Sequence, residues 1–539
     1  MTDKSTADHA LPENKSEIPL WMAMFPVFVL IALLVVNVIF YGADSSYGPN
    51  QIALLMATAA AALVGVMIKI PVKSMVDGMQ NSIASALVAM MILLLIGALT
   101  GTWMISGIVP AMIYYGLDIL SPEIFLFATA IICAIVSVVT GSSWSTVATV
   151  GIALLGIGRA MGIQDGWIAG AIISGAYFGD KISPLSDTTN LASAMAGTEL
   201  ITHIRYMLWT TVPSFVIALG IYFAMGYSSE PIEMVGGTEA LKAQIDANFN
   251  LSLFVFVVPV LVLGMVVMKV DALFALFIGA VAGGILAVCM QPEVVENVSG
   301  LKPVAIEDVD GNETGEFRER VYAEHAYSAF MNSMALGTSI ISGDRVNELK
   351  VEKEALDAES NDDAVVSRIT EIDAEIAAAD LLTGKGMVGM LNTIWLIITA
   401  MCFGGIMEAC GLLQRITRPL VNFAQSTGSL VATTAGSCVF LNVTASDQYL
   451  AIVVPGRMFR ETYAERGLAP ENLSRTLEDS GTVTSVLIPW NTCGAAQHAV
   501  LGVAVIAFAP FCFFNLISPI MTILFAWIGI RIAKLKPEK

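Results

Sequence analysis

The sequence predicts an all-α polytopic membrane protein made of two inverted-topology repeats, and three observations support this fold class. The 539-residue chain is 56% hydrophobic and 14% charged, with a mean hydropathy of +0.74, whereas soluble proteins carry about 25% charged residues. Several apolar runs are long enough to cross a hydrocarbon core about 30 Å thick. Polar interruptions also recur in both halves of the chain at a nearly constant spacing.

The first membrane repeat is expected over residues 19–226, after a polar tail at residues 1–18. Residues 107–119 form a short amphipathic stretch that suits the membrane interface. The apolar runs that are long enough for full spans cover residues 21–41, 51–68, 82–104 and 207–225.

A re-entrant hairpin is expected next to these spans. Two apolar arms, residues 124–139 and 147–155, flank a tip rich in Ser, Thr and Gly at residues 140–146. Each arm is marginal for a full crossing, and apolar runs of about 10–14 residues more often form re-entrant segments. We therefore expect the polar tip to lie at mid-membrane.

A broken helix follows the hairpin, with its break at residues 179–190. This stretch contains glycine, proline, lysine and two aspartates between apolar runs. A charged side chain at mid-bilayer costs roughly 2.5–3.5 kcal/mol on insertion scales. Unwound backbone is tolerated at that depth only where it is buried in protein or lines a cavity. The stretch therefore predicts a helix that is interrupted at an ion-binding site.

The second repeat is expected to start at residues 251–290, after an extracytoplasmic loop at 227–250, and to continue over residues 385–532, before a tail at 533–539. Its predicted elements are spans at 253–268, 273–290, 387–407 and 517–530, an interfacial stretch at 411–423, a hairpin at 430–454 with its tip at 444–448, and a broken helix with interruptions at 478–484 and 489–494.

The two halves correspond residue by residue. Thr140 pairs with Thr444 and Ser142 with Ser446, both at a spacing of 444 − 140 = 304. Each half has about five full spans and one re-entrant hairpin, so an odd number of crossings turns the second half upside down. Inverted repeats of this kind place the substrate near the bilayer midplane, between paired broken helices.

Residues 291–384 are expected to form an acidic insert outside the membrane, with 21 Asp and Glu against 7 Lys and Arg. Residues 345–359 and 362–382 are rich in Ala, Glu, Leu and Lys, which predicts a helical hairpin. The insert is either a solvated insertion or a surface that attracts cations towards the pore.

The distribution of basic residues predicts that both termini are cytoplasmic, in a multi-pass protein of the bacterial inner membrane, with Arg159 as an exception. We expect membrane lipid and a transported cation as partners, and no nucleic acid. The seven cysteines lack a C-x-x-C pair and the four histidines lack metal-ligand spacing, so we expect no cofactor beyond the transported ions.

The paired tips and breaks predict a cation site. Half-helix ends expose unsatisfied carbonyl and amide groups, and hard cations prefer ligand sets made only of oxygen. Burial favours the protonated form of a carboxylate, so a cation that displaces this proton couples the two ions. The candidate cation- and proton-binding residues are Asp187, Asp180, Asp447, Asp479, Ser142, Ser143, Ser186, Thr188, Thr189, Asn190, Thr444, Ser446, Asn491 and Thr492. The expected Na+ ligands among them are Asp187, Thr188, Asn190, Ser446, Asp447 and Asn491.

The candidate carboxylates also have structural explanations. Asp180 could form a local ion pair with Lys181, Asp187 could cap the helix that starts at Thr188, and Asp447 could cap the second hairpin arm. Asp187, which is flanked by small polar residues at the break, is the most specific candidate.

The stretches Thr140–Thr146, Gly179–Asn190 and Ile488–Ala495 resemble the NhaC-type Na+/H+ antiporter family. The likeness covers about residues 20–290 and 386–530, and the acidic insert departs from it. The resemblance implies the ion-transporter superfamily fold, with a scaffold part, a transport part that holds both hairpins, a homodimer and an elevator-like movement. Members of the family exchange Na+ for H+, and relatives exchange organic acids such as malate and lactate.

The same residues bear on three possible functions. The acidic site with neutral oxygens favours Na+/H+ antiport. A Na+- or H+-coupled exchanger of organic acids or amino acids would need a cationic group, and Lys181 is the obvious intramembrane candidate. An intramembrane enzyme would need a nucleophile–base pair or a metal cluster. No histidine or cysteine lies beside the tip serines, so we expect no enzymatic activity.

Overall fold

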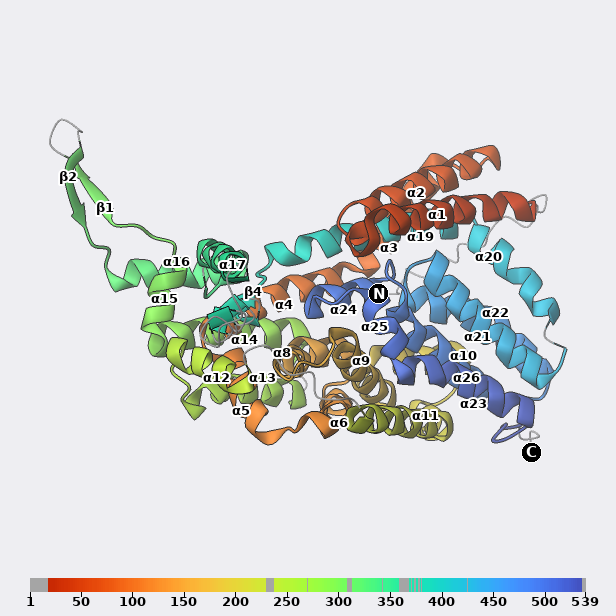
Figure 1. The fold of residues 1–539 in the computed structure, drawn as a ribbon. Coiled ribbons are helices and arrows are strands. Elements are labelled where there is room, and N and C mark those ends of the chain that lie inside the picture. Colours follow the sequence, from red (N-terminus) through yellow and green to blue (C-terminus); the bar gives the residue numbers. More distant parts are fainter. Residues whose placement is uncertain are drawn as a thin grey trace, which may run out of the picture.

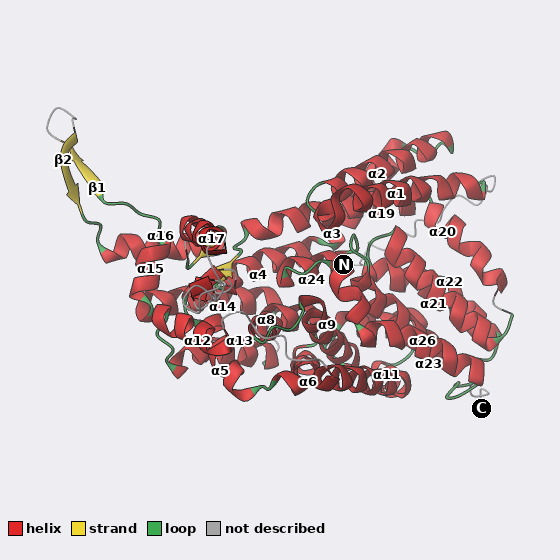
Figure 2. Cartoon of the chain, in the orientation of Figure 1, coloured by secondary structure: helices red, strands yellow, loops and turns green. Residues whose placement is uncertain are grey.

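The computed structural model describes residues 18–228, 237–268, 270–307, 313–341, 343–357, 381–423 and 425–535, together with single positions between 368 and 379. Helices make up nearly all of this part of the chain (Figures 1 and 2). The strands form two small antiparallel sheets, in which β1 pairs with β2 and β3 with β4. The all-α class is therefore confirmed.

The first half of the chain contains thirteen consecutive helical elements. They are α1 (Leu20–Tyr41), η1 (Gly42–Ser46), α2 (Pro49–Met67), α3 (Val72–Ser85), α4 (Leu87–Ile105), α5 (Ile108–Ile119), α6 (Pro122–Thr140), α7 (Ser143–Thr146), η2 (Val147–Gly151), α8 (Ile152–Ala160), α9 (Asp165–Ile182), α10 (Asp187–Ala196) and α11 (Leu200–Ser228).

The second half begins with the elements that lead to the insert, in the order α12 (Gly237–Asn248), η3 (Leu253–Phe256), α13 (Val257–Val267), α14 (Ala272–Met290), α15 (Pro292–Val298), β1 (Val304–Glu307), β2 (Glu313–Arg318), α16 (Tyr322–Ala335), β3 (Thr338–Ser339), α17 (Gly343–Asp357) and β4 (Thr383–Gly384). It continues with η4 (Val388–Met390), α19 (Leu391–Ala409), α20 (Leu412–Thr417), η5 (Arg418–Phe423), α21 (Thr427–Thr444), α22 (Gln448–Glu465), α23 (Pro470–Leu477), η6 (Glu478–Thr482), η7 (Ser485–Leu487), α24 (Thr492–Leu501), α25 (Val505–Phe508), η8 (Ala509–Phe511) and α26 (Phe513–Ile528).

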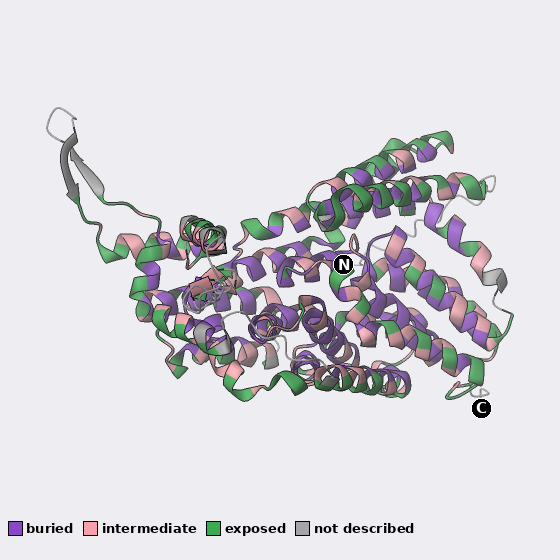
Figure 3. Ribbon diagram, in the orientation of Figure 1, coloured by how far each residue is buried: buried purple, intermediate pink, exposed green. Residues whose placement is uncertain are grey.

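Seven of the described helices are long and apolar enough to cross a membrane, and two bent helix pairs raise this number to nine. One of the seven is α6, which has 19 residues although the sequence predicts a marginal re-entrant arm there. One bent pair joins α12 to α13 at 88°, where the sequence predicts a loop followed by a straight span. Figure 3 shows exposed residues along α1 and α2, and α1 exposes large apolar side chains such as Trp21, Phe28 and Phe40. Such a surface fits contact with lipid rather than water.

The helix boundaries of the two halves repeat. The 19-residue helices α4 and α19 begin at Leu87 and Leu391, a spacing of 391 − 87 = 304. The ten-residue helices α10 and α24 begin at a spacing of 492 − 187 = 305. Gly107 and Gly411, which precede α5 and α20, both adopt a positive φ, of 79° and 70°. Glycine tolerates this left-handed conformation because it has no Cβ.

The two repeats also pack on each other reciprocally. Helix α4 of the first repeat packs against α14 and α16 of the second, while α19 of the second packs against α2 and α3 of the first. When two units are related by a two-fold axis, each contact from the first unit to the second is repeated from the second to the first, as it is here. Helix α16 therefore has the position that α3 has in the other repeat, although the sequence assigns it to the acidic insert.

The tips of the two hairpins correspond to each other at a spacing one residue longer than the predicted one. Ser142 caps α7 and Asp447 caps α22, so the spacing at the tips is 447 − 142 = 305 rather than 304. The residue with positive φ is Gly141 in the first tip (66°) and Ser446 in the second (58°). The extra residue is Ala445, which follows the last turn of α21.

Within the insert, the predicted helical hairpin corresponds to α17 and to the described positions between 368 and 379. Arg345 on α17 forms an ion pair with Glu375 at 3.0 Å, and Glu352 pairs with Arg368 at 2.9 Å. The two segments of the predicted helical hairpin therefore lie side by side, while part of the second segment is outside the described residues. Figure 1 shows the β1–β2 pair extending away from the helices.

Close packing of α6 on α9 predicts a test of the fold. A Cβ added to Gly175 of α9 would lie 2.1 Å from the carbonyl oxygen of Ala130 on α6. We expect Gly175→Ala to destabilise the protein by about 1–3 kcal/mol because the backbone must shift. Gly220→Ala on α11 is the matched control, since no heavy atom lies within 4 Å of its added Cβ. Thermal melting of the purified variants in detergent measures both effects, and equal melting temperatures would contradict this packing.

Candidate functional site

Four helices, α7, α10, α22 and α24, start at the polar interruptions of the chain, and the side chain of the residue before each helix caps it. At the hairpin tips, Ser142 accepts a hydrogen bond from the Ser145 amide at 3.2 Å and Asp447 accepts one from the Leu450 amide at 2.8 Å. At the breaks, Ser186 accepts from the Thr189 amide at 3.4 Å and Asn491 from the Cys493 amide at 3.1 Å. These side chains satisfy amide groups that every helix start leaves free.

The tips and breaks of both repeats meet at one cavity of about 150 Å³. The junction of α3 and α4, from Ser85 at the end of α3 to Ile92 in α4, forms another wall. The predicted site residues that line the cavity are Ser142, Ser143, Asp180, Asp187, Thr188, Asp447 and Thr492. The structure therefore brings together half of the predicted set, from four segments that are far apart in sequence.

Asp180 is the most strongly constrained carboxylate of the cavity. Its side chain is buried, and its Oδ2 accepts hydrogen bonds from the amide and the hydroxyl of Ser143 at 3.1 and 2.7 Å. Its Oδ1 is buried and has no hydrogen-bond partner among the described residues. A buried carboxylate oxygen without a partner is unfavourable, so this atom is a candidate ligand for a cation or a carrier for a proton.

Asp187 and Asp447 add two further carboxylates, in different environments. Asp187 is exposed, and its oxygens accept hydrogen bonds from the Thr188 amide and the Tyr449 hydroxyl. Asp447 is 4% exposed and uses one oxygen to cap α22. None of the described residues that line the cavity is Lys, Arg or His, so its walls carry only negative formal charge.

Six predicted residues do not line the cavity and form structural contacts instead. Ser186 caps α10, the Thr189 hydroxyl donates to the Lys181 carbonyl, the Asn190 amide group to the Ser186 carbonyl, and the Thr444 hydroxyl to the Phe440 carbonyl. Asn491 donates to the Asn442 carbonyl at 3.1 Å and so ties the break to the second tip. The Ser446 carbonyl accepts from the Thr492 amide, while its buried hydroxyl has no partner among the described residues.

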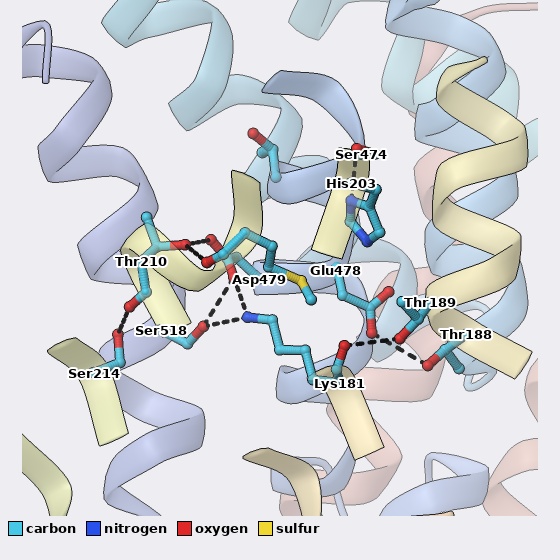
Figure 4. Close-up of polar contacts among 12 residues, drawn as sticks. Lys181, Thr188, Thr189, His203, Thr210, Ser214, Ser474, Glu478, Asp479 and Ser518 are labelled. Atoms are coloured by element: carbon cyan, nitrogen blue, oxygen red, sulfur yellow. Dashed lines mark hydrogen bonds and ion pairs between the residues drawn. The ribbon is translucent and has the colours of Figure 1, made fainter. Parts of the chain in front are cut away.

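Asp479 lies in a separate buried cluster, where it forms an ion pair with Lys181 (Figure 4). Both side chains are fully buried. Thr210 donates to Asp479 Oδ2 at 2.8 Å, and Lys181 donates to the Ser518 hydroxyl at 3.0 Å. The sequence also allowed a local ion pair between Lys181 and Asp180. In the structure Lys181 pairs instead with Asp479 of the other repeat.

Sequence reasoning missed several residues that line the cavity or adjoin it. Gln448 and Tyr449 directly follow the cap Asp447, and Cys493 follows Thr492, so each is adjacent to a predicted residue. The Cys493 thiol donates to Gln448 Oε1 at 2.5 Å, across the two segments. Glu478, by contrast, is recognised in the sequence as a carboxylate of the interruption at 478–484; it is buried and accepts a hydrogen bond from the Thr188 hydroxyl at 3.2 Å. Gln448, Tyr449 and Cys493 each lie one or two residues after a helix cap, and this position is the signal in the sequence that could have identified them.

Comparisons with known proteins agree with this architecture. A family model described as the Na+/H+ antiporter family matches residues 175–301 and 356–530. The Na+/H+ antiporter NhaC of Alkalihalophilus pseudofirmus is 36% identical over 438 residues, which are 81% of each chain. The malate-2H+/Na+-lactate antiporter of Bacillus subtilis is 30% identical over 483 residues, 89% of this chain and 90% of that one. The arginine/ornithine antiporter ArcD of Halobacterium salinarum is 31% identical over 449 residues, 82% and 79% of the two chains.

These relatives are named as antiporters, and the described helices of this chain are apolar and long enough for a multi-pass membrane protein. The family model covers both broken helices and the second hairpin, and the relatives match 81–89% of this chain. This chain therefore belongs to the NhaC-type Na+/H+ antiporter family.

Proposed function

We propose that this protein exchanges Na+ for H+ across the cytoplasmic membrane, and that the two ions compete for the carboxylates of the cavity. The observation that supports this function is the charge of the cavity walls. Asp180, Asp187 and Asp447 line them, and no described lining residue is basic. Carboxylates that share a site repel one another, so the site is stabilised when it holds a cation or a proton.

The ligand chemistry of the cavity also supports a hard cation. The lining residues offer carboxylate, hydroxyl and amide oxygens, and Asp180 Oδ1 has no partner among the described residues. Oxygen ligands suit hard cations, whereas histidine and thiolate suit softer metals. A proton on the same carboxylates would remove the charge that binds the cation. Binding of one ion would therefore exclude the other, as exchange requires.

The second candidate function is exchange of an organic acid or an amino acid, because two relatives carry such names. The size of the cavity favours the inorganic ion. Its volume of about 150 Å³ is below the roughly 300–1,000 Å³ of typical small-molecule pockets. An organic anion would also need a cationic partner, and Lys181, the expected one, is fully buried in its ion pair with Asp479.

The remaining features of the proposal are cytoplasmic termini, a homodimer and elevator-like alternating access. The first is supported by the distribution of Lys and Arg along the sequence. The other two follow from what the resemblance to the NhaC-type family implies. The protein then acts as a transporter without an enzymatic step.

Transport in reconstituted vesicles tests the substrate. Purified protein in vesicles with a trapped pH dye should move protons when Na+ alone is added, because no organic co-substrate is needed to fill the cavity. Vesicles without protein give the background leak. Proton movement that requires added malate, lactate or arginine would exclude Na+/H+ exchange and support the second function.

Two helix-capping aspartates offer a matched test of the site. Asp447 caps α22 inside the cavity and Asp271 caps α14 outside it, with hydrogen bonds of 2.8 and 2.9 Å to backbone amides. Asparagine caps a helix as well as aspartate does, so both Asp→Asn variants should fold. We expect Asp447→Asn to weaken Na+-driven proton movement by roughly 10- to 100-fold, since an interaction with a charged group contributes about 1.5–3 kcal/mol.

The control variant Asp271→Asn should retain wild-type transport. Na+-driven proton movement is measured in vesicles as a function of Na+ concentration, and the melting temperature of each variant measures its folding. The two measurements together distinguish the loss of a cation ligand from the loss of structure. Wild-type transport by Asp447→Asn would show that the Asp447 carboxylate is not part of the ion-binding site.

A further inference from the structure

Three arginines gather at one end of the membrane helices, and the proposed exchange does not use them. Arg205 lies near the start of α11, Arg475 lies on α23, and Arg531 lies three residues after the end of α26. None of the three lines the cavity. Within the described part of the chain, none of them forms an ion pair. Their positive charges are therefore not neutralised by contact with a described carboxylate.

The segment that carries Arg531 is fixed against α11 and α23. The Tyr206 hydroxyl on α11 contacts the Arg531 carbonyl and accepts a hydrogen bond from the Ala533 amide at 3.1 Å. Asn472 on α23 donates to the Ala533 carbonyl at 2.7 Å. Figure 1 shows this end of the chain next to α23. These contacts hold the Arg531 backbone in one place, against two helices.

Trp209 on α11 brings two of the arginines onto one surface. Arg531 Cζ lies 3.7 Å from the centre of the Trp209 ring, which is the geometry of a cation–π contact. Arg205 precedes Trp209 by four residues on the same helix, so their side chains are neighbours on one face. All three side chains are exposed, that of Trp209 to 48%. Two guanidinium groups therefore lie next to one exposed indole ring.

Arg475 lies directly behind this surface. Its side chain is 0% exposed, its Nη1 donates to the Arg531 carbonyl at 3.2 Å, and its Cζ lies 4.7 Å from the centre of the Tyr206 ring. Its Nε and Nη2 are buried and have no hydrogen-bond partner among the described residues. A buried charge without compensation is strongly unfavourable. An anion bound on the outer side of the Arg531 segment would compensate it, because Coulomb interactions are strong where little water intervenes.

Carboxylates lie at this end of the protein, but they do not compensate the arginines by contact. Glu199 precedes α11 and accepts a hydrogen bond from the Thr202 hydroxyl at 3.3 Å. Glu471 is partly exposed in the first turn of α23. Among the described residues, neither forms an ion pair with any of the three arginines. The arginines therefore remain available to an anion from outside the chain.

The depth of the surface in the membrane indicates which anion reaches it. Helix α11 has 29 residues, which corresponds to about 43 Å at 1.5 Å per residue, whereas the hydrocarbon core is about 30 Å thick. Because arginine is costly inside the core, the end with Arg205 is expected to extend into the headgroup region. Exposed apolar side chains, Ile201 at 46% and Ile528 at 60%, lie at the same helix ends. Tryptophan is enriched at this membrane–water interface.

We propose that the surface formed by Arg205, Trp209 and Arg531 binds the phosphate headgroup of an anionic phospholipid. The two guanidinium groups would donate hydrogen bonds to the phosphate oxygens, a geometry that suits arginine. The indole and the exposed apolar side chains would contact the lipid below its headgroup, and Arg475 would add positive potential from behind. The apolar surroundings favour a lipid over a free phosphate ion, which has no apolar part to bury.

A bound headgroup would stabilise the contact between α11 and α26. The two helices pack against each other, and the headgroup would bridge Arg205 on the first and Arg531 at the end of the second. Thr210, the residue after Trp209, donates to Asp479 of the buried ion pair at 2.8 Å. The position of α11 therefore also supports the interruption at η6, and lipid binding is expected to raise the thermal stability of the protein.

Thermal melting of the full-length protein in detergent tests the site. Phosphatidylglycerol should raise the melting temperature saturably, whereas phosphatidylcholine with the same acyl chains should have a much smaller effect and inorganic phosphate should have none. Arg205→Gln and Arg531→Gln should each raise the phosphatidylglycerol concentration for half-maximal stabilisation by roughly fivefold, because one basic residue near an anionic membrane surface contributes about this factor.

Arg418→Gln is the matched control. Arg418 in η5 is also exposed, and it forms no ion pair or ring contact with the described residues. This variant should keep the wild-type dependence on phosphatidylglycerol. Native mass spectrometry gives a second measurement, which does not depend on melting. It should detect phosphatidylglycerol bound to the wild-type protein and less of it on the two variants at the proposed site.

Three results would overturn the lipid site. One is an unchanged half-maximal concentration in both Arg205→Gln and Arg531→Gln. Another is equal stabilisation by the two lipids, which would assign the effect to the acyl chains. The third is stabilisation by inorganic phosphate that is lost in the same variants, which would assign the surface to a free anion. None of these measurements involves transport, so they do not depend on the proposed Na+/H+ exchange.

Discussion

The buried ion pair between Lys181 and Asp479 is the contact on which the arrangement of both broken helices depends. Each charge is fully buried, and an uncompensated charge in such a place would destabilise the protein by about 3–5 kcal/mol. Because Lys181 lies in the last turn of α9 of the first repeat and Asp479 in the first turn of η6 of the second, their pairing fixes the two interruptions against each other. Asp180 and Glu478, the residues immediately before them, are thereby held at the cavity and beside Thr188, which lines it.

The pair also explains the charge of the cavity. The lysine at the start of the predicted break pairs with Asp479, so the described cavity walls keep three carboxylates and no basic group. Polar atoms left without partners, such as Asp180 Oδ1 and Glu478 Oε2, lie at or beside this space. Binding of a cation or of a proton would compensate these buried acceptors.

Local features of the structure could be predicted from the sequence because their causes are local. Apolar runs predicted the helices, and Asp447 caps the second hairpin arm, α22, as one structural explanation predicted. The cap predicted at Asp187 is wrong, because α10 starts one residue earlier and Ser186 caps it. Contacts between distant segments could not be predicted. Asp479 pairs with Lys181, 298 residues away, and Asp187, the favoured carboxylate, is exposed whereas Asp180 is buried. One extra residue, Ala445, shifts the tip register without changing the polar pattern. These outcomes depend on how the repeats pack on each other.

Binding of Na+ to the purified protein is the most direct test of the central claim, that cation and proton compete for the cavity carboxylates. Radiolabelled Na+ should bind saturably to the protein in detergent, and lowering the pH should displace it, because protonation removes the negative charge that holds the cation. Asp180→Asn should abolish the binding while the protein remains folded. Saturable binding that does not change with pH, or that survives in Asp180→Asn, would contradict the account.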